Sequence, residues 1–313
     1  MLVNLLLIAL GVVLLYGGGE LLIRGASRLA LALGLSPLVI GLTVVAFGTS
    51  SPELAATLVA SLKGSPEIAL GNVLGSNIAN IGLILGISAL VGSLKARGQM
   101  VLREVPFMIG VGVLLLALVE WKDGLGLMDG VIFLTLFVAY LYVLFKFDEV
   151  PAVEEDVIGR AKEGGSTAVN VVMVVTGILV LVGGAESLVR GGVAMARDLG
   201  VSERVIGLSM VAIGTSLPEL ASSLVALARK EADILLGNII GSNVFNVLLV
   251  LAITVLVKPM RVDLAVFGAD LWIAIIFSLL VVPLLFFGRR NRLHRVEGLI
   301  LLGAYGFYLF QLF

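Results

Sequence analysis

The sequence predicts an all-α membrane protein with ten transmembrane helices, arranged as two inverted five-helix repeats. Three observations lead to this prediction: the composition, the succession of apolar runs, and an internal repeat at a fixed shift. Hydrophobic residues make up 59% of the 313 residues and charged residues only 14%, with a mean hydropathy of +1.14. This balance is typical of membrane-embedded chains rather than soluble domains of this size.

Apolar runs long enough to cross a bilayer recur along the chain. Each is expected to be a helix, because a backbone in lipid must satisfy its own hydrogen bonds. The predicted spans are residues 2–23, 35–61, 67–91, 101–120, 126–146, 167–189, 203–228, 233–257, 264–287 and 296–313. The first run lacks the basic start and cleavage site of a signal peptide, which predicts that it is retained.

The chain repeats itself on either side of a polar stretch, residues 147–166. GGELLIRGAS, beginning at Gly18, aligns without a gap with GAESLVRGGV, beginning at Gly184, and the same shift places GNVLGSNIAN at Gly71 on GNIIGSNVFN at Gly237. Shared membrane composition explains matched Leu and Val, but not matched Gly, Thr, Ser, Pro, Glu and Asn. We therefore expect a first repeat over 1–146, an acidic cytoplasmic linker over 147–166 and a second repeat over 167–313.

The charges predict how this arrangement is oriented. Five spans in each half turn the second half over relative to the first, which is the plan of many secondary transporters. Fourteen of the 21 Lys and Arg residues fall in one set of alternating loops, which begins after the first span and includes the central linker. Because cytoplasmic loops are enriched in Lys and Arg, we expect a multi-pass cell-membrane protein with both termini outside.

Two short polar motifs lie inside the second and seventh apolar runs, GTSSPE at Gly48–Glu53 and GTSLPE at Gly214–Glu219. A proline kinks a helix and frees backbone carbonyls, which are tolerated at membrane depth where they line a cavity or bind a cation. Pro and Gly alone also fit an ordinary kink. A carboxylate near the bilayer centre costs roughly 2.5–3.5 kcal/mol on insertion scales, so Glu53 and Glu219 favour ion or proton traffic over a structural role.

The third and eighth runs carry polar residues at steps of four, which keeps each trio on one helical stripe. The trios are Asn72, Ser76, Asn80 and Asn238, Ser242, Asn246. Interhelical hydrogen bonding without a ligand is the alternative for every Asn, and for the neighbouring Asn77 and Asn243 it is the better interpretation. For Asn80 and Asn246 we favour ion coordination, because both could carry amide oxygens towards the same two Glu.

Together the motifs offer carboxylate, amide, hydroxyl and carbonyl oxygens, without imidazole or sulfur. The single His, His294, lies in a basic loop, and the chain has no Cys. Such donors suit a hard cation such as Ca²⁺, whereas Zn²⁺ or Cu would want His or Cys. Two carboxylates balance one Ca²⁺ or two Na⁺, so both ions can compete for one cavity. We infer no resident cofactor, no nucleic-acid partner and no obligatory protein partner beyond these ions and the lipid bilayer.

Other acids are expected to be structural. Glu20 and Glu186 are related by the same shift and stand four residues before Arg24 and Arg190, which predicts an ion pair within each helix. Asp270, inside the ninth run, is taken to have no acid at the matching place in the first half and is given no role.

The paired motifs, GTSSPE with GNVLGSNIAN and GTSLPE with GNIIGSNVFN, resemble the two alpha repeats of the calcium/cation antiporter superfamily, and within it the prokaryotic sodium/calcium exchangers. The resemblance covers both halves of the chain. It implies ten helices, with four around the ion site and two long gating helices, the first and sixth, that slide in alternating access. The ligands that it implies are Glu53, Glu219, Thr49, Ser50, Ser76, Thr215, Ser216, Ser242, the amides of Asn80 and Asn246, and the carbonyls of Ala46 and Ala212.

Two differences within that superfamily bear on the transported ions. Potassium-dependent exchangers and some prokaryotic relatives have Asp where this chain has Asn246, so this chain lacks one negative charge. Proton-coupled calcium exchangers typically carry an acid in the GNxxE part of the second motif, which is absent here and favours sodium.

Alternatives to sodium/calcium exchange stay open. A buried Glu can bind a proton as well as a cation, which keeps proton-coupled exchange of calcium or another divalent cation as the main alternative. Inverted symmetry about a pair of acids argues against a channel. The lack of a His cluster or an activated nucleophile argues against an intramembrane enzyme.

Overall fold

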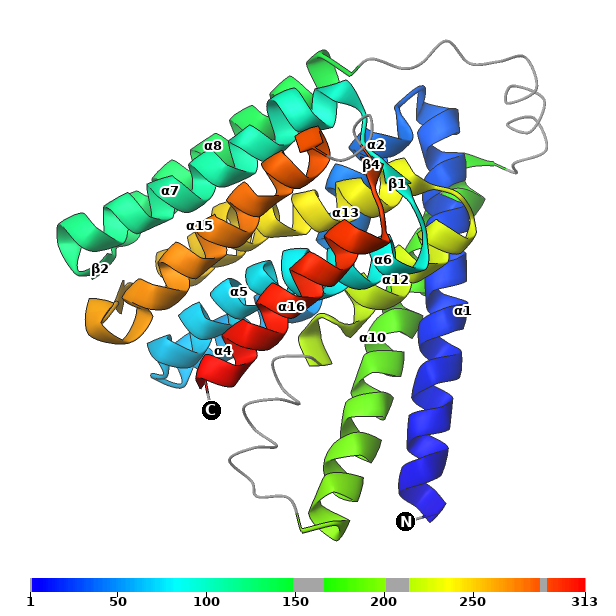
Figure 1. The fold of residues 1–313 in the computed structure, drawn as a ribbon, viewed down its shortest axis with the longest axis horizontal. Helices are drawn as coiled ribbons and strands as arrows, with labels where there is room; N and C mark the ends of the chain where they lie inside the picture. The colour runs from blue at the N-terminus through cyan, green and yellow to red at the C-terminus, as the bar shows by residue number, and fades with distance from the viewer. Residues whose placement is uncertain (1, 149–165, 201–213, 288–291, 313) are drawn as a thin grey trace. The chain divides into compact units, whose positions relative to one another are not determined.

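Helices dominate the computed structural model, which describes residues 2–148, 166–200, 214–287 and 292–312 (Figure 1). The helices are α1 (Leu2–Leu33), α2 (Pro37–Ile40), α3 (Ala46–Thr49), α4 (Ser51–Leu62), α5 (Pro66–Ala79), α6 (Gly86–Val91), α7 (Val105–Lys122), α8 (Leu127–Lys146), α10 (Thr167–Asp198), α12 (Leu217–Ala228), α13 (Ala232–Phe245), α14 (Ala252–Val257), α15 (Leu264–Phe287) and α16 (Arg295–Leu312). Four π-helical turns join or begin them: η1 (Gly41–Val45), η2 (Asn80–Leu85), η3 (Met100–Glu104) and η4 (Asn246–Leu251).

Seven of the described helices are long and apolar enough to cross a membrane, and the count is eight if the bent pair Pro37–Thr49 and Ser51–Leu62 is one span. The chain is therefore an all-helical, multi-pass membrane protein. The count of ten stays a prediction, because residues 203–213 of the seventh predicted span lie outside the described residues and α16 is not among the seven helices.

The elements recur at the shift seen in the sequence. In the first half α4, α5, η2, α6 and β1 begin at residues 51, 66, 80, 86 and 94. In the second half α12, α13, η4, α14 and β3 begin at residues 217, 232, 246, 252 and 260. Each pair of starting points is separated by the same interval as Gly18 and Gly184, so the duplicated sequence forms duplicated local structure.

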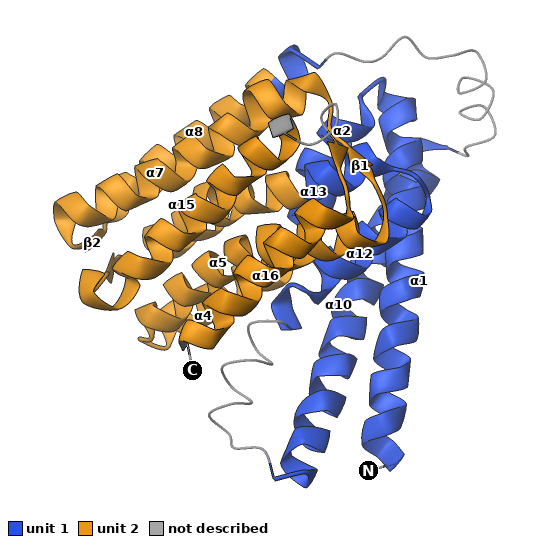
Figure 2. Cartoon of the chain, viewed as in Figure 1, with its two compact units in different colours: residues 1–49, 144–238 blue, residues 50–143, 239–313 orange. Residues whose placement is uncertain are grey.

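The chain divides into two compact units (Figure 2). Unit 1 is Met1–Thr49 with Leu144–Asn238, and unit 2 is Ser50–Val143 with Ile239–Phe313. Each unit therefore combines segments from both predicted repeats.

In unit 1 the long helices α1 and α10 pack against each other along their length, antiparallel (Figure 1). Glycines at every seventh position of both helices allow this: Gly11, Gly18 and Gly25 in α1, and Gly177, Gly184 and Gly191 in α10. A methyl group on Gly18 would lie 2.7 Å from the backbone nitrogen of Leu181, and one on Gly184 would lie 2.8 Å from that of Leu15. The two backbones are thus in direct contact, which only glycine permits.

Both of these helices are longer than the sequence predicted. The predicted spans end at residues 23 and 189, whereas α1 continues to Leu33 and α10 to Asp198. The predicted spans stop before the basic residues Arg24 and Arg190, but the helices continue past them. A helix of 32 residues is about 48 Å long, well beyond the hydrocarbon core of about 30 Å.

Unit 2 is built around α5–η2–α6, against which α4, α15 and α16 pack. The continuous segments Pro66–Val91 and Ala232–Val257 are the inner helices. In their most apolar 18-residue stretches 78% and 83% of the residues are buried, against 33–44% in the other spans. Two short antiparallel ladders complete the unit: β1 (Leu94–Lys95) with β4 (Arg292–Leu293), and β2 (Gly124–Leu125) with β3 (Met260–Arg261).

Candidate ion-binding site

Both motif acids stand in the first turn of a helix that starts at a break. The chain bends by 44° between Pro37–Thr49 and Ser51–Leu62, which agrees with the predicted kink at this motif. Pro52 occupies the first turn of α4, where its missing N–H leaves no hydrogen bond unmade, and Pro218 does the same in α12. Glu53 and Glu219 follow directly and are each 1% exposed. A helix N-terminus is electropositive, which favours a negative charge at this position.

In unit 2 an asparagine braces the turn that carries Glu53. Asn72 of α5 donates through Nδ2 to the hydroxyl of Thr57 at 2.9 Å and to the backbone carbonyl of Glu53 at 3.4 Å. The bonds tie α5 to α4, so the position of the Glu53 backbone depends on the neighbouring helix.

In unit 1 the repeat-related asparagine braces the turn that carries Glu219. Asn238 Nδ2 donates to Ser222 Oγ at 3.2 Å, and Ser222 Oγ donates to the carbonyl of Glu219 at 3.0 Å. Thr49 Oγ1 donates to Asn238 Oδ1 at 3.0 Å and lies 3.4 Å from the carbonyl of Ala46. Asn72 and Asn238 therefore have the interhelical role that the sequence left open for every Asn in these runs.

Four further asparagines of unit 2, Asn77, Asn80, Asn243 and Asn246, form a symmetric cluster that we call the Asn quartet. Asn80 Nδ2 donates to Asn243 Oδ1 at 2.9 Å, and Asn246 Nδ2 donates to Asn77 Oδ1 at 3.0 Å. Asn77 and Asn243 each donate to the other's backbone carbonyl at 3.3 Å. The prediction that Asn77 and Asn243 make interhelical hydrogen bonds is confirmed.

Several buried side-chain oxygens near these residues have no hydrogen-bond partner among the described residues. They are Ser76 Oγ, Asn80 Oδ1, Ser242 Oγ and Asn246 Oδ1 in unit 2, and Ser216 Oγ in unit 1. Buried polar atoms in native proteins are nearly always satisfied, and a bound cation would satisfy such oxygens. All five belong to residues that the sequence proposed as ligands, although buried oxygens of Ser88, Asn170 and Ser223, which it did not propose, also lack a partner within the described chain.

The remaining predicted ligands are distributed over both units. Ser50 is buried in unit 2, Thr49 and Ala46 are buried in unit 1, and Thr215 is half-buried in unit 1. Ala212 lies outside the described residues. Within unit 2, α4 packs on both α5 and η4, which brings the helix of Glu53 against the segments that carry Ser76 and Asn246. Within unit 1, α3 contacts α12, the helix of Glu219.

The sequence did not predict the π-helical turns beside the site. Asn80 begins η2 and Asn246 begins η4, while η1 ends immediately before Ala46. A π-helical turn contains one residue more than an α-helical turn and leaves backbone groups less regularly bonded, and such turns are frequent at functional sites. No single residue type marks them in the sequence.

Sequence reasoning also missed a pair of acid–tyrosine contacts in unit 2. Glu104 is buried and accepts hydrogen bonds from Tyr140 at 3.1 Å and from Arg103 Nε at 2.7 Å. Asp270, which occupies the equivalent position in the second repeat, accepts one from Tyr308 at 3.2 Å. The repeat shift relates the two acids, so the expectation that Asp270 has no matching acid in the first half is wrong, and the same shift was the signal that could have found Glu104. These contacts join η3 to α8 and α15 to α16, so we assign them a structural role in holding neighbouring helices together.

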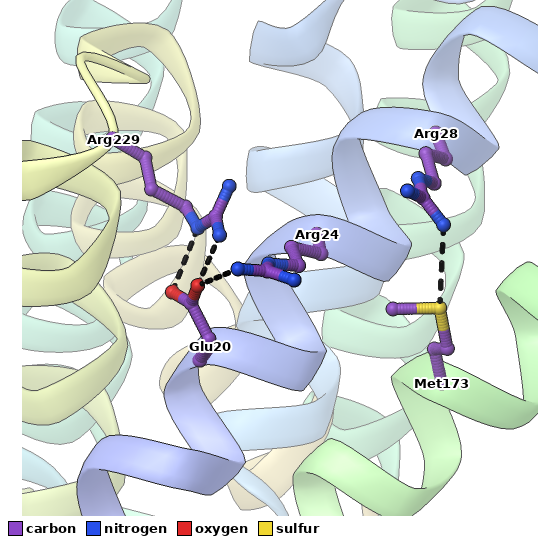
Figure 3. A network of polar contacts seen from close by, with 5 residues as sticks. All are labelled: Glu20, Arg24, Arg28, Met173 and Arg229. Atoms are coloured by element: carbon purple, nitrogen blue, oxygen red, sulfur yellow. Dashed lines mark hydrogen bonds and ion pairs between the residues drawn. The ribbon is translucent and has the colours of Figure 1, made fainter. Parts of the chain in front are cut away.

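The ion pairs predicted within α1 and α10 are present, and the pair in α1 includes a third residue that the sequence did not predict (Figure 3). Arg190 pairs with Glu186, and Arg24 lies 2.6 Å from Glu20. Glu20 also accepts two hydrogen bonds from Arg229 at the end of α12, one of them from Nε at 2.7 Å. The guanidinium therefore links α1 to α12, a contact 209 residues apart in sequence that helical spacing could not reveal.

Known proteins resemble the chain over its whole length. The family model described as "Sodium/calcium exchanger protein" matches residues 3–146 and 169–313. The putative antiporter CaxA of Alkalimonas amylolytica is 37% identical, over 100% of this chain and 99% of its own length. The inner membrane protein YrbG of Escherichia coli is 32% identical, over 100% of this chain and 98% of its own.

Solved structures of the sodium-calcium exchanger NCX_Mj have the same fold. One of them, soaked without Na⁺ and Ca²⁺, matches with a TM-score of 0.86 and 31% identity, over 100% of this chain and 99% of that chain. The superfamily resemblance of the two motifs is thereby confirmed. Since the family model covers both halves and full-length relatives share about a third of the residues, the chain belongs to the sodium/calcium exchanger protein family.

Proposed function

We propose that this chain is an antiporter that exchanges Na⁺ for Ca²⁺ across the cell membrane by alternating access. The observation that carries the proposal is a duplicated one: two acids, each 1% exposed, stand in the first turns of broken helices at positions that the repeat makes equivalent. Buried carboxylates in a membrane protein are retained for ion traffic, and their duplication fits an inverted-repeat transporter.

Glu53 and Glu219 would share one site with neutral oxygens from both repeats. The proposed ligands are Glu53, Glu219, Thr49, Ser50, Ser76, Asn80, Thr215, Ser216, Ser242 and Asn246, with the carbonyls of Ala46 and Ala212. Support comes from the buried oxygens that lack a partner among the described residues and from the all-oxygen donor set, which suits Ca²⁺ and Na⁺. No resident cofactor is needed, since the ions are the transported substrates.

The charge of this site explains how two ions can exclude each other. The two carboxylates carry a charge of about −2, which one Ca²⁺ or two Na⁺ would neutralise, so either load is stable in a poor dielectric and both together are not. A third Na⁺ would leave a positive site and make exchange electrogenic. Asn246 contributes an oxygen without charge, which keeps the total at two carboxylates.

Sodium-driven calcium uptake in proteoliposomes tests the proposal. Vesicles loaded with Na⁺ and diluted into Na⁺-free buffer with radioactive Ca²⁺ should accumulate Ca²⁺ when an ionophore has collapsed the pH gradient. Vesicles loaded with choline serve as the matched control. Uptake that follows only a pH gradient would replace the proposal by proton-coupled exchange, and uptake without any counter-ion would indicate a channel.

The same proposal includes an organisation for the chain. Ten spans form the repeats 1–146 and 167–313, the linker 147–166 lies in the cytoplasm, and both termini lie outside. The bias of Lys and Arg between alternate loops supports this orientation.

A further inference from the structure

The side-chain amides of the Asn quartet each have a fixed orientation, because two of them face backbone carbonyls, which can only accept hydrogen bonds. A backbone carbonyl has no proton to donate, so the side chain that faces it must present its NH₂ group. Asn243 Nδ2 faces the carbonyl of Asn77 at 3.3 Å and the sulfur of Met108 at 3.5 Å, both acceptors. The Asn243 amide therefore has one orientation, with Oδ1 turned to Asn80.

The orientation of the Asn243 amide determines that of the Asn80 amide. Asn243 Oδ1 is an acceptor, so Asn80 must offer it Nδ2, which it does at 2.9 Å. Rotation of the Asn80 amide would bring two oxygens face to face. Asn80 Oδ1 is consequently directed away from the quartet, and it is buried without a hydrogen-bond partner among the described residues.

The repeat-related half of the quartet has the same set of constraints. The carbonyl of Asn243 accepts from Asn77 Nδ2 at 3.3 Å, Asn77 Oδ1 accepts from Asn246 Nδ2 at 3.0 Å, and Asn246 Oδ1 is left without a partner within the described chain. Two backbone carbonyls thus determine how four amides are turned. The outcome at both ends is an oxygen, the atom that a cation requires.

We propose that Asn77 and Asn243 are positioning residues that hold the amides of Asn246 and Asn80 with their oxygens towards the transported cation. The proposal rests on the proposed function, because it takes Asn80 and Asn246 as ligands. It adds that each ligand is oriented by the asparagine three residues before its counterpart in the other repeat, so each repeat orients the ligand of the other. Outer partners of this kind typically contribute 10- to 100-fold to metal affinity.

Double-mutant cycles on Ca²⁺ affinity test the proposal. The dissociation constant of Ca²⁺ is measured by calorimetry on the full-length protein in Na⁺-free detergent solution. Asn243→Ala should weaken Ca²⁺ binding about 10- to 100-fold. In the Asn80→Ala background it should change the constant by less than about twofold, because its target is already gone. In the Asn246→Ala background it should keep its full effect.

The repeat-related variant, Asn77→Ala, supplies the matched control. Asn77→Ala should be without further effect in the Asn246→Ala background and fully effective in the Asn80→Ala background. A merely structural role would give the same effect in both backgrounds, and this result would overturn the proposal. So would an Asn80→Ala variant that binds Ca²⁺ as tightly as the parent. If Asn243→Ala does not purify as a folded protein, Asn243→Ser and the Asn77 cycle answer the same question.

These outcomes are separable from a failure of the proposed function. A parent protein that neither binds Ca²⁺ nor takes it up against Na⁺ would refute the exchange proposal. A parent protein that exchanges normally, with additive cycles throughout, would refute only the positioning role.

Discussion

At the residue scale, the acids that we place in the ion site depend on their own helices for part of their stabilisation. Glu53 and Glu219 are buried in first turns, where backbone N–H groups and the helix dipole favour a negative charge. The effect supplies on the order of 1 kcal/mol, less than the cost of burying a carboxylate, so a bound cation would add the larger share of the stabilisation.

Neutralising either acid should abolish exchange. Glu53→Gln and Glu219→Gln keep the shape of the side chain but leave a site with one carboxylate, which cannot balance Ca²⁺. Radiocalcium uptake in proteoliposomes measures the loss. Glu186→Gln is the matched control, since this acid is 57% exposed and pairs with Arg190 on its own helix, and it should retain transport. Full uptake by either Gln variant at the motifs would contradict the assignment.

Adding an acid at Asn246 should change ion preference rather than eliminate binding. Asn246→Asp raises the negative charge of the site and so favours loads with more positive charge. We expect an altered ratio of Na⁺ to Ca²⁺ affinity, measured by competition of Na⁺ against Ca²⁺ binding. An unchanged ratio would show that Asn246 does not face the ions.

Stability should respond to pH through Glu231, which lies in the turn between α12 and α13. Burial raises the pKa of Glu231, and the hydrogen bond that Ser27 donates at 3.0 Å opposes the rise. A raised folded pKa contributes stability below the unfolded value of about 4.3, and this is lost as pH rises through the folded value. Glu231→Gln keeps an acceptor for Ser27 but cannot ionise.

We therefore expect Glu231→Gln to unfold at a higher temperature than the parent at pH 7 and at the same temperature near pH 4. Intrinsic fluorescence during heating measures both. The exposed Glu186→Gln should show no such pH-dependent gain. A Glu231→Gln protein that is less stable at pH 7 would mean that the charge itself is needed in the turn.

The chemistry of the candidate site was visible in the sequence because the duplication presents it twice. GTSSPE and GTSLPE identify the acids without any structure, and steps of four identify Asn80 and Asn246. The orientation of the amides could not be predicted, because it is set by contacts between residues 163 to 169 positions apart. Sequence spacing describes one helix and says nothing of which backbone carbonyl a second helix offers.

At the scale of elements, the packing of α1 on α10 depends on glycine. A methyl group on Gly177 would lie 2.5 Å from the backbone nitrogen of Leu22, whereas one on Gly183 of the same helix would meet nothing within 4 Å. Gly177→Ala should therefore destabilise the protein by about 1–3 kcal/mol through overpacking. Gly183→Ala should be neutral or stabilising by up to about 1 kcal/mol, since Ala favours helix.

Thermal unfolding in detergent compares the two glycine variants directly. Equal stabilities would mean that α1 and α10 are not in backbone contact in solution. The spacing of seven is present in the sequence but does not predict this contact, since glycine is common in membrane helices and one stripe does not say which helix covers it. The broken helices, by contrast, were predictable from Pro52 and Pro218.

At the scale of the whole molecule, the repeat predicts that equivalent positions face opposite sides of the membrane. Lys95 in β1 and Arg261 in β3 are both exposed and occupy equivalent positions of the two repeats. The chain has no cysteine, so single substitutions can be labelled without background. Lys95→Cys should react with an impermeant maleimide only from the cytoplasmic side, and Arg261→Cys only from outside. Labelling of both from one side would contradict the inverted arrangement.

The strand pairs show how closely the halves are combined. In unit 2, β1 of the first half pairs with β4 of the second, and β2 of the first pairs with β3 of the second. The sequence predicted two consecutive repeats, and hydropathy cannot tell whether such repeats fold separately or exchange elements. That distinction lies in long-range pairing, which leaves no local signal.

An exchanger must never open its ion site to both sides of the membrane at once, because the ion gradients that drive it would then dissipate through the protein. If α1 and α10 control access to the ion site, their contacts at the glycines make them move together, since neither backbone can shift without displacing the other. Closure of the site on one side would then accompany its opening on the other. Bulkier residues in place of the glycines should weaken the contact between α1 and α10 and let ions leak through the protein.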